Sequence, residues 1–264
     1  MKYLFVISFL LQATISSFAQ QSKFKEMEAD LLRAHSKLFS FYQHDNDSLE
    51  AQSDLFSSKL LSYISKNPAT LNYSFQALKD SNVVEIATSA DSLFRIYSWD
   101  TWLGGTMHDF ENIYQYKSGG KVRFLHPKTR EDDPVAFYSE IFTIKTGNKT
   151  WYMVIGNTIS STKDLGQFVK ALTIENNSVN DTAKLFRTKT KFLNEIYVVY
   201  DFLSVADRPA RPVKLIKYDS DKKIVYIPVV KEDGKVTDRF ILYQFNGRYF
   251  EHIMTEKEPR GLNR

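Results

Sequence analysis

The sequence predicts a mainly β protein that begins with helices, because its hydrophobic period changes along the chain. Up to about residue 79, apolar residues recur three or four positions apart, which is the spacing of one helix face. From Val83 onward the period is two, and short runs rich in Val, Ile, Tyr and Phe alternate with turn residues. The 20 Phe and 15 Tyr residues also favour strands. The expected fold class is mainly β (α+β overall), with N-terminal helices followed by antiparallel four-stranded meanders, propeller-like or sandwich-like.

The chain opens with the features of a signal peptide. Lys2 supplies a positive charge, an apolar run follows up to Leu11, and the small residues Ser17 and Ala19 occupy the positions that a signal peptidase reads. The apolar run is shorter than the roughly 20 residues that a membrane span requires. We therefore expect cleavage near Ala19, export to the periplasm or the medium, and no transmembrane segment in the mature chain.

Four parts are expected in order along the chain. They are a signal peptide (1–19), a helical segment (20–80), a β-meander domain (81–258) and a C-terminal tail (259–264). In the helical segment, Asp47 with Glu50 resembles a capping box that begins the second helix. Pro68 should end that helix, because a proline disfavours helical angles at the residue before it. The expected helix faces comprise Phe24, Met27, Leu31, His35, Leu38 and Tyr42 in the first helix and Leu49, Phe56, Leu60 and Ile64 in the second.

The β region reads as a loose repeat of four-stranded units that begin near Val83, Phe137 and Val213. Meanders in series are typical of propeller blades, but three units are too few for a usual propeller. An antiparallel sandwich or open sheet built from the same hairpins is the alternative. Asn246-Gly247 predicts a type I′ hairpin turn. Pro228 predicts an edge strand or a bulge, because proline cannot donate a ladder hydrogen bond.

Composition excludes several classes of function. The chain has no cysteine, which removes disulfides, a lipoprotein anchor, thiol nucleophiles and thiolate metal sites. Its net charge of +4 comes from lysines that alternate with acids, so no clustered basic face for nucleic acid is expected. The common nucleotide, hydrolase and zinc-protease motifs are missing, and no cofactor is predicted. His108 and His126 lie near opposite ends of one hairpin, so no shared metal site is expected.

The stretch SWDTWLGGTMHDF, residues 98–110, is the strongest candidate for a site. It holds two of the three tryptophans, a Gly-Gly pair, a histidine and two aspartates. Turn chemistry accounts for the glycines, but Trp102 on the loop must either cap the core or meet a ligand. Because sugars stack their C–H faces on tryptophan, a binding site formed by Trp102, Asp100, His108 and Asp109 is predicted on this loop.

The first functional hypothesis is a non-catalytic binding module for a glycan or an envelope partner. A second is a glycoside hydrolase acting on a polysaccharide, which needs two carboxylates. Asp100, Asp109 and Glu111 are the candidate carboxylates, because alternation places the last two on one face of a strand and Asp100 lies across the hairpin. A third is a structural scaffold that contacts another protein through its helices. Whether the protein is an enzyme stays open at this level.

The segment TSADSLFRIYSWDTWLGGTMHDFENIYQY resembles a segment of an uncharacterised group of exported Gram-negative bacterial proteins. The shared pattern is D-x-x-x-R-x-Y-S-W-D-x-x-x-G-G-T, followed by a β-rich body. The resemblance covers about 30 residues. It implies an exported, Gram-negative setting and brings no activity and no functional residue.

Overall fold

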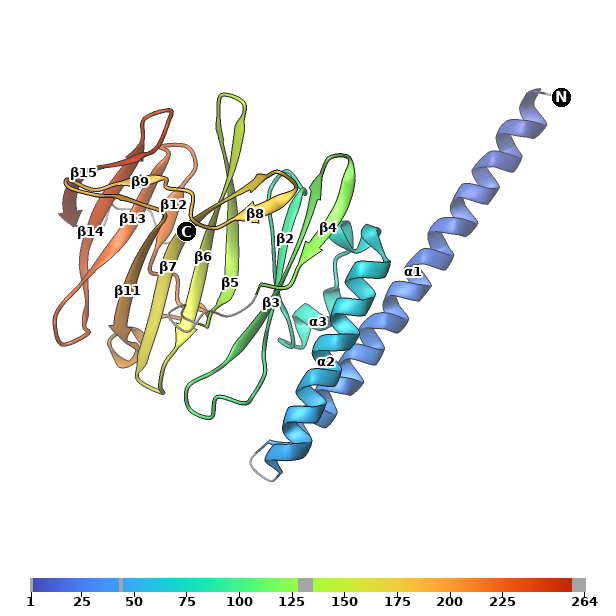
Figure 1. Cartoon of the computed structure of the whole chain (residues 1–264), viewed down its shortest axis with the longest axis horizontal. Helices are drawn as coiled ribbons and strands as arrows, with labels where there is room; N and C mark the ends of the chain where they lie inside the picture. The colour runs from blue at the N-terminus through green and yellow to red at the C-terminus, as the bar shows by residue number, and fades with distance from the viewer. Residues whose placement is uncertain (1, 43–44, 128–134, 258–264) are drawn as a thin grey trace. The chain divides into compact units, whose positions relative to one another are not determined.

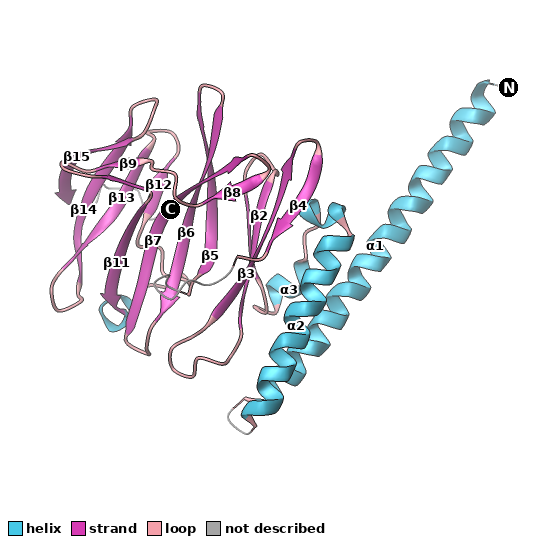
Figure 2. Cartoon of the chain, in the orientation of Figure 1, coloured by secondary structure: helices cyan, strands magenta, loops and turns pink. Residues whose placement is uncertain are grey.

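The computed structural model describes residues 2–42, 45–127 and 135–257, and it separates into two compact units, Met1–Val84 and Glu85–Arg264. Figures 1 and 2 show the helices of the first unit and the antiparallel sheets of the second. The predicted fold class, mainly β with N-terminal helices, is confirmed. The C-terminal tail predicted at 259–264 lies outside the described residues.

The first unit is built on a pair of long helices, α1 (Lys2–Phe41) and α2 (Asn46–Lys66). A 3₁₀ turn, η1 (Pro68–Asn72), and a short helix, α3 (Gln76–Asp80), follow. The Phe, Met, Leu and Ile members of both predicted faces are buried, and His35 and Tyr42 are half-buried, which confirms the three-four spacing of this segment. Among the described residues, no helix has the length and apolar character needed to cross a membrane.

The cap of α2 differs from the predicted capping box. Asp45, not Asp47, is the N-cap, and its carboxylate accepts the backbone N–H of Ser48 at 3.0 Å. The same carboxylate accepts the Ser48 hydroxyl, so Asp45 satisfies a helix N–H that would otherwise lack a partner. The choice between two aspartates two residues apart depends on backbone angles that the pattern does not encode.

Helix α3 receives its cap from another helix. Phe75 at its N-cap has a left-handed backbone (φ 48°) and provides no side-chain cap. Instead Glu28 of α1, only 4% exposed, accepts the backbone N–H groups of Ala77 at 3.0 Å and Leu78 at 3.3 Å. Its other oxygen accepts the hydroxyl of Tyr73 at 2.6 Å, and burial together with this bond raises the pKa of Tyr73. A carboxylate also suits the positive end of the helix dipole.

Across its described residues, the second unit holds three sheets. The first two begin close to predicted repeats, at Glu85 and Phe137, whereas the third begins with β9, ahead of the predicted start near Val213. The first sheet is the meander β1-β2-β3-β4, which confirms the first predicted unit. The second has the order β11-β7-β6-β5, with β8 paired to β7. The third has the order β10-β9-β15-β14-β13-β12, in which β9 and β15 run parallel. The strands are β1 (Glu85–Thr88), β2 (Phe94–Asp100), β3 (Phe110–Ser118), β4 (Lys121–Leu125), β5 (Phe137–Thr146), β6 (Lys149–Ile159), β7 (Asp164–Glu175), β8 (Ser178–Asn180), β9 (Phe186–Arg187), β10 (Phe192–Leu193), β11 (Glu195–Asp201), β12 (Lys217–Asp219), β13 (Ile224–Val230), β14 (Val236–Phe245) and β15 (Phe250–Lys257), with a 3₁₀ turn η2 (Phe202–Val205) after β11.

The second sheet is covered on both faces, so the unit is layered. Along β6, Trp151, Met153 and Ile155 pack against the third sheet. The alternate residues Tyr152 and Val154 pack against the first sheet. Because successive strand residues point to opposite faces, this one strand contributes to two cores. Face-to-face packing of this kind matches the sandwich alternative better than the propeller.

Two predicted turn features have different outcomes. The strand pairing between β13 and β14 shifts between Pro228 and Val230, which confirms the bulge alternative for Pro228. The type I′ turn at Asn246-Gly247 is wrong. The link spans four residues, and Gly247 has a positive φ (96°) whereas Asn246 does not. The Asn246 side chain accepts the N–H groups of Arg248 and Tyr249 at 3.0 and 3.1 Å, which makes an Asx turn instead.

A buried glutamine links the second sheet to the segment before β12. Gln167 of β7 is 1% exposed. Its carboxamide oxygen accepts the N–H of Leu215 at 3.0 Å and that of Ile216 at 2.6 Å. Its nitrogen donates to the carbonyl of Val213 at 3.0 Å and to the Asn157 side chain at 2.7 Å. One side chain therefore satisfies four buried polar partners.

Buried tyrosines make the β unit sensitive to alkaline pH. Burial raises the pKa of Tyr200 to about 12 against the opposing effect of Arg211 and Arg208, and burial also raises the pKa of Tyr152. A raised folded-state pKa means that the fold favours the protonated phenol, so this stability is present below pH ~10 and is lost as the pH rises through ~12. We expect cooperative unfolding in that window, measured as tryptophan emission beside phenolate absorbance.

The matched variant for this prediction is Tyr200→Phe, which keeps the ring and removes the titrating group. It should lose less stability than the parent between pH ~10 and ~12. Titration of all phenols near their ordinary value, with the fold intact, would contradict the prediction.

Candidate functional site

The loop between β2 and β3 is closed by its own backbone. Thr101 donates its N–H to the carbonyl of Asp109 at 2.8 Å, and Met107 donates to the carbonyl of Gly104 at 3.2 Å. A Cβ added at Gly104 would lie 1.7 Å from the Met107 carbonyl oxygen, so no larger residue fits there without moving the backbone. Gly105 has a positive φ of 65°, which favours glycine. The Gly-Gly pair therefore shapes the loop, as turn chemistry predicts.

Trp102 has a strained backbone held by a carboxylate. Its φ is 62°, which is rare for a bulky side chain. The Trp102 N–H donates to Oδ1 of Asp100 at 2.8 Å, and this bond fixes the turn. The tryptophan ring is half-buried and lies 6.3 Å, centroid to centroid, from the ring of His108. The loop thus presents part of a tryptophan ring at some cost in backbone energy.

His108 is oriented from two sides. Its Nδ1 contacts Oδ2 of Asp100, so one carboxylate positions both Trp102 and His108. Its backbone N–H donates to the carbonyl of Ile159, the last residue of β6, at 3.0 Å. This bond attaches the loop to the second sheet. The structure therefore brings together three of the four predicted binding residues: Asp100, Trp102 and His108.

The histidine belongs to a row of four neighbouring rings. The ring of His108 is stacked on Phe110 of β3 with centroids 6.1 Å apart. Phe110 in turn contacts Phe137, the first residue of β5, with centroids 4.9 Å apart. All four rings, from Trp102 to Phe137, are half-buried. We call Trp102, His108, Phe110 and Phe137 the aromatic row.

The candidate carboxylates are not all on one side of the hairpin. Asp100 is paired with Phe110, whereas Glu111 is paired with Trp99. Directly paired residues share a face and neighbours alternate, so Asp100 and Glu111 point to opposite faces. Oδ2 of Asp109 accepts the Thr101 hydroxyl at 3.3 Å.

The two histidines have separate carboxylate partners. Glu111 lies 3.8 Å from Nε2 of His126, whereas Asp100 contacts His108. Within the part of the chain that the structure describes, no group of three or more potential metal ligands is found. The histidines thus take part in two different pairs on the two faces of the hairpin.

Other loops meet the candidate loop at the same end of the β unit, along the lower edge of that unit in Figure 1. The loops at this end comprise residues 100–109, 160–163, 202–208 and 231–235. The N–H of Phe202 donates to the carbonyl of Lys163 at 2.8 Å, and that of Asp201 to the carbonyl of Gly234 at 2.8 Å. These bonds connect the β6–β7 turn, η2 and the β13–β14 turn.

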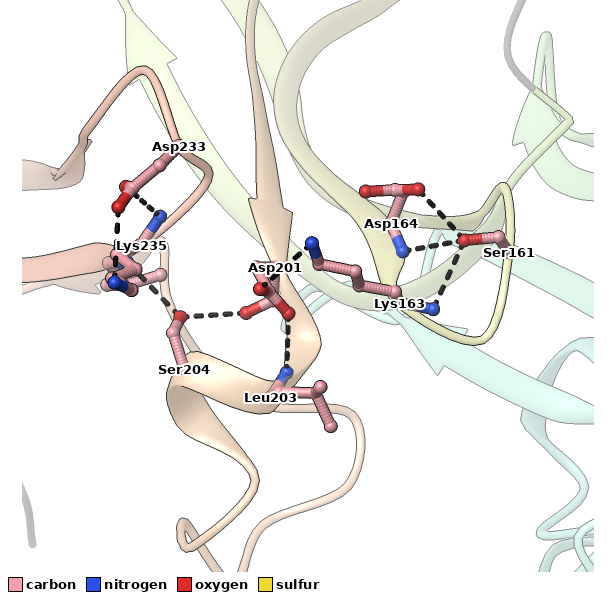
Figure 3. Close-up of polar contacts among 9 residues, drawn as sticks. Ser161, Lys163, Asp164, Asp201, Leu203, Ser204, Asp233 and Lys235 are labelled. Carbon is pink, nitrogen blue, oxygen red and sulfur yellow. Dashed lines mark hydrogen bonds and ion pairs between the residues drawn. The ribbon is translucent and has the colours of Figure 1, made fainter.

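Side-chain contacts brace these loops further (Figure 3). The Lys163 ammonium lies 3.6 Å from the Asp201 carboxylate, and the Ser204 hydroxyl donates to the Asp201 carbonyl at 2.7 Å. The side chain of Leu203 points away from this polar cluster and is 68% exposed. The loops around the candidate site are therefore held by several polar contacts.

Two members of the aromatic row were not predicted from the sequence. Phe110 could have been found, because it follows Asp109 and alternation places it opposite Asp100. Phe137 lies 27 residues further along, on another sheet, and its contact with Phe110 depends on tertiary packing. Spacing within one hairpin carries no signal for such a contact.

Residues of the same segment outside the loop have structural roles. Asp91 accepts the Ser89 hydroxyl and the Leu93 N–H, and the Ser98 hydroxyl donates to Asn112. No known protein family matches the chain, and no curated protein is similar enough to count as a relative.

Proposed function

We propose that the protein is an exported, non-catalytic binding module of the cell envelope whose aromatic row takes a glycan. Export rests on the features of residues 1–19. A glycan is proposed as the ligand because the apolar C–H face of a sugar ring stacks on an aromatic face while nearby polar atoms form hydrogen bonds with its hydroxyls. The His108 ring and the Asp100 carboxylate supply such polar atoms beside the row.

The observation that carries the proposal is the backbone of Trp102. Asn or Gly adopts a φ near 60° with little strain, whereas a bulky residue there costs about 1 to 2 kcal/mol. The turn itself therefore does not require tryptophan. Strain of this kind gathers at binding sites, where the position of a side chain matters more than local stability.

Exposed apolar side chains on the same loop support binding over a purely structural role. Leu103 is 45% exposed and Met107 is 59% exposed. They flank Trp102 and His108 on a loop fastened to the second sheet. A rigid sheet with binding residues on its loops is a common arrangement in binding proteins.

Trp102→Asn should abolish glycan binding and leave the free energy of unfolding within about 1 kcal/mol of the parent. Asparagine fits the left-handed backbone and removes the ring, so the lost contacts and the relieved strain offset each other. Binding is measured by calorimetry on residues 20–264 with soluble cello-, malto- and chito-oligosaccharides. Tryptophan emission adds a local readout in the parent, because Trp99 and Trp151 are buried and Trp102 is not.

Phe124→Ala is the matched control, since Phe124 is an aromatic residue 46% exposed on β4 and outside the row. It should bind as the parent does. The proposal is contradicted if the parent binds no glycan and Trp102→Asn lowers the free energy of unfolding by about 3 kcal/mol or more. Trp102 would then be a structural cap.

Analysis of the sugar products distinguishes the hydrolase hypothesis from the binding proposal. The parent incubated with the same oligosaccharides should release no shorter sugars, because Asp109 and Glu111 alternate with Phe110 along the chain and so face away from the row, where Asp100 has no second candidate carboxylate. Cleavage that Asp100→Asn or Asp109→Asn removes would replace binding with catalysis as the function.

A further inference from the structure

We infer that the ligand of the aromatic row is an extended, uncharged oligosaccharide that lies along the row, rather than a single sugar or an acidic glycan. This inference rests on the proposed glycan-binding function and adds the class of ligand. It follows from two observations: the arrangement of the rings, and the charges beside them.

The rings succeed one another at intervals close to the width of one ring. Centroid distances are 6.3 Å from Trp102 to His108, 6.1 Å from His108 to Phe110 and 4.9 Å from Phe110 to Phe137. The rings come from a loop, β3 and β5, so the row crosses from the first sheet to the second. The ring planes are inclined to one another by 54°, 16° and 51° along the row, so the row turns along its length and a ligand that spans it needs several linked units.

The charged side chain beside the row is the Asp100 carboxylate, which contacts the imidazole of His108. Among the described residues, this carboxylate pairs with His108 and with no lysine or arginine. A uronic acid or a phosphorylated sugar would bring like charge to this surface, which is unfavourable, whereas hydroxyls can donate to carboxylates.

The two ends of the row lie on separately anchored elements. The Trp102 end is fixed by Asp100 and by the bond from His108 to Ile159. The Phe137 end is fixed at the start of β5, where the Tyr138 N–H donates to the Ser98 hydroxyl at 3.0 Å. A ligand that spans the row contacts both ends, whereas a short ligand contacts one.

The test is a length series measured by calorimetry on the exported chain, from glucose to cellohexaose, beside an oligogalacturonate of matched length. Affinity should rise with length and then level off, with the tetrasaccharide binding about 100-fold more tightly than the monosaccharide. The oligogalacturonate should bind at least about tenfold more weakly than its neutral counterpart, with a gap that narrows as salt is added.

Phe137→Leu tests the far end of the row and keeps an apolar residue of similar volume. It should weaken binding of the tetrasaccharide about tenfold and leave the affinity for the shortest ligand that binds unchanged. Phe124→Ala, outside the row, should leave the dissociation constants of both ligands unchanged. Thermal unfolding of each variant establishes that the fold is intact.

The outcomes separate this inference from the proposed function. Equal affinity for the monosaccharide and the tetrasaccharide, or tighter binding of the acidic series, overturns the extended, uncharged ligand but keeps a glycan site at Trp102. An unchanged tetrasaccharide constant in a folded Phe137→Leu variant also overturns it. Binding of no member of either series contradicts the proposed function itself.

Discussion

Gln167→Leu should lower the free energy of unfolding of the β unit by about 4 kcal/mol. Leucine has a similar size, so the change leaves little cavity. It removes the acceptor for the N–H groups of Leu215 and Ile216 and the donor to the Val213 carbonyl. These groups lie among buried residues, and each buried polar group left without a partner costs about 1 to 3 kcal/mol.

The measurement is chemical denaturation followed by tryptophan emission. Trp99, Trp102 and Trp151 all lie in the second unit, so this signal reports that unit alone. Gln244→Leu is the control, because Gln244 is exposed on β14 and its replacement should change stability by no more than about 0.5 kcal/mol. Equal stabilities of the two variants would show that the Gln167 contacts contribute little.

Glu28→Leu should destabilise the helical unit by about 3 kcal/mol. The side chain is buried, and its loss leaves the N–H groups of Ala77 and Leu78 and the hydroxyl of Tyr73 without their acceptor. Since Phe75 provides no side-chain cap, α3 has no replacement for Glu28 at its start. We expect α3 to fray and the apolar contact of Leu78 to weaken.

This variant is followed by far-ultraviolet circular dichroism at the helical band, because the helical unit has no tryptophan. Glu28→Gln keeps one acceptor oxygen and should lose less stability than Glu28→Leu. Glu26→Leu, at an exposed position of the same helix, should lose almost none. A Glu28→Leu variant as stable as the Glu26→Leu control would refute the capping role.

Periodicity was sufficient for the type and order of the elements. The three-four stripes place Leu31 and Phe56 in the helical core, and the change to a period of two begins where β1 follows. Local patterns carry this information because one face of each element must be apolar to be buried. Turn glycines were also readable, as Gly104 and Gly105 show.

What periodicity could not predict was which strand pairs with which. The segment AKLFRT follows β8 along the chain, but it contains β9 of the third sheet, and β11 takes the fourth place in the second sheet. Both segments are short and apolar, so the choice is made by tertiary packing. Gln167 is a similar case, because a polar residue in a strand usually faces solvent and its buried partners come from a distant segment.

The candidate site was predicted in part for the same reason. Asp100, Trp102 and His108 lie within nine residues, and their contacts follow from one loop. The place of Glu111 depends on the register of the β2–β3 hairpin, which puts it beside Trp99 and away from Asp100. Phe137 required knowledge of how two sheets meet.

Helix α1 bears on the cleavage that the sequence predicts at Ala19. It runs without a break from Lys2 to Phe41, through the expected cleavage site at Ala19. A protease reads its substrate as extended chain, in which the scissile carbonyl is not tied into a helical turn. If the chain is cleaved at Ala19 as the sequence predicts, the cut has to precede the winding of α1 around that residue. The remaining helix would then start beside Gln20.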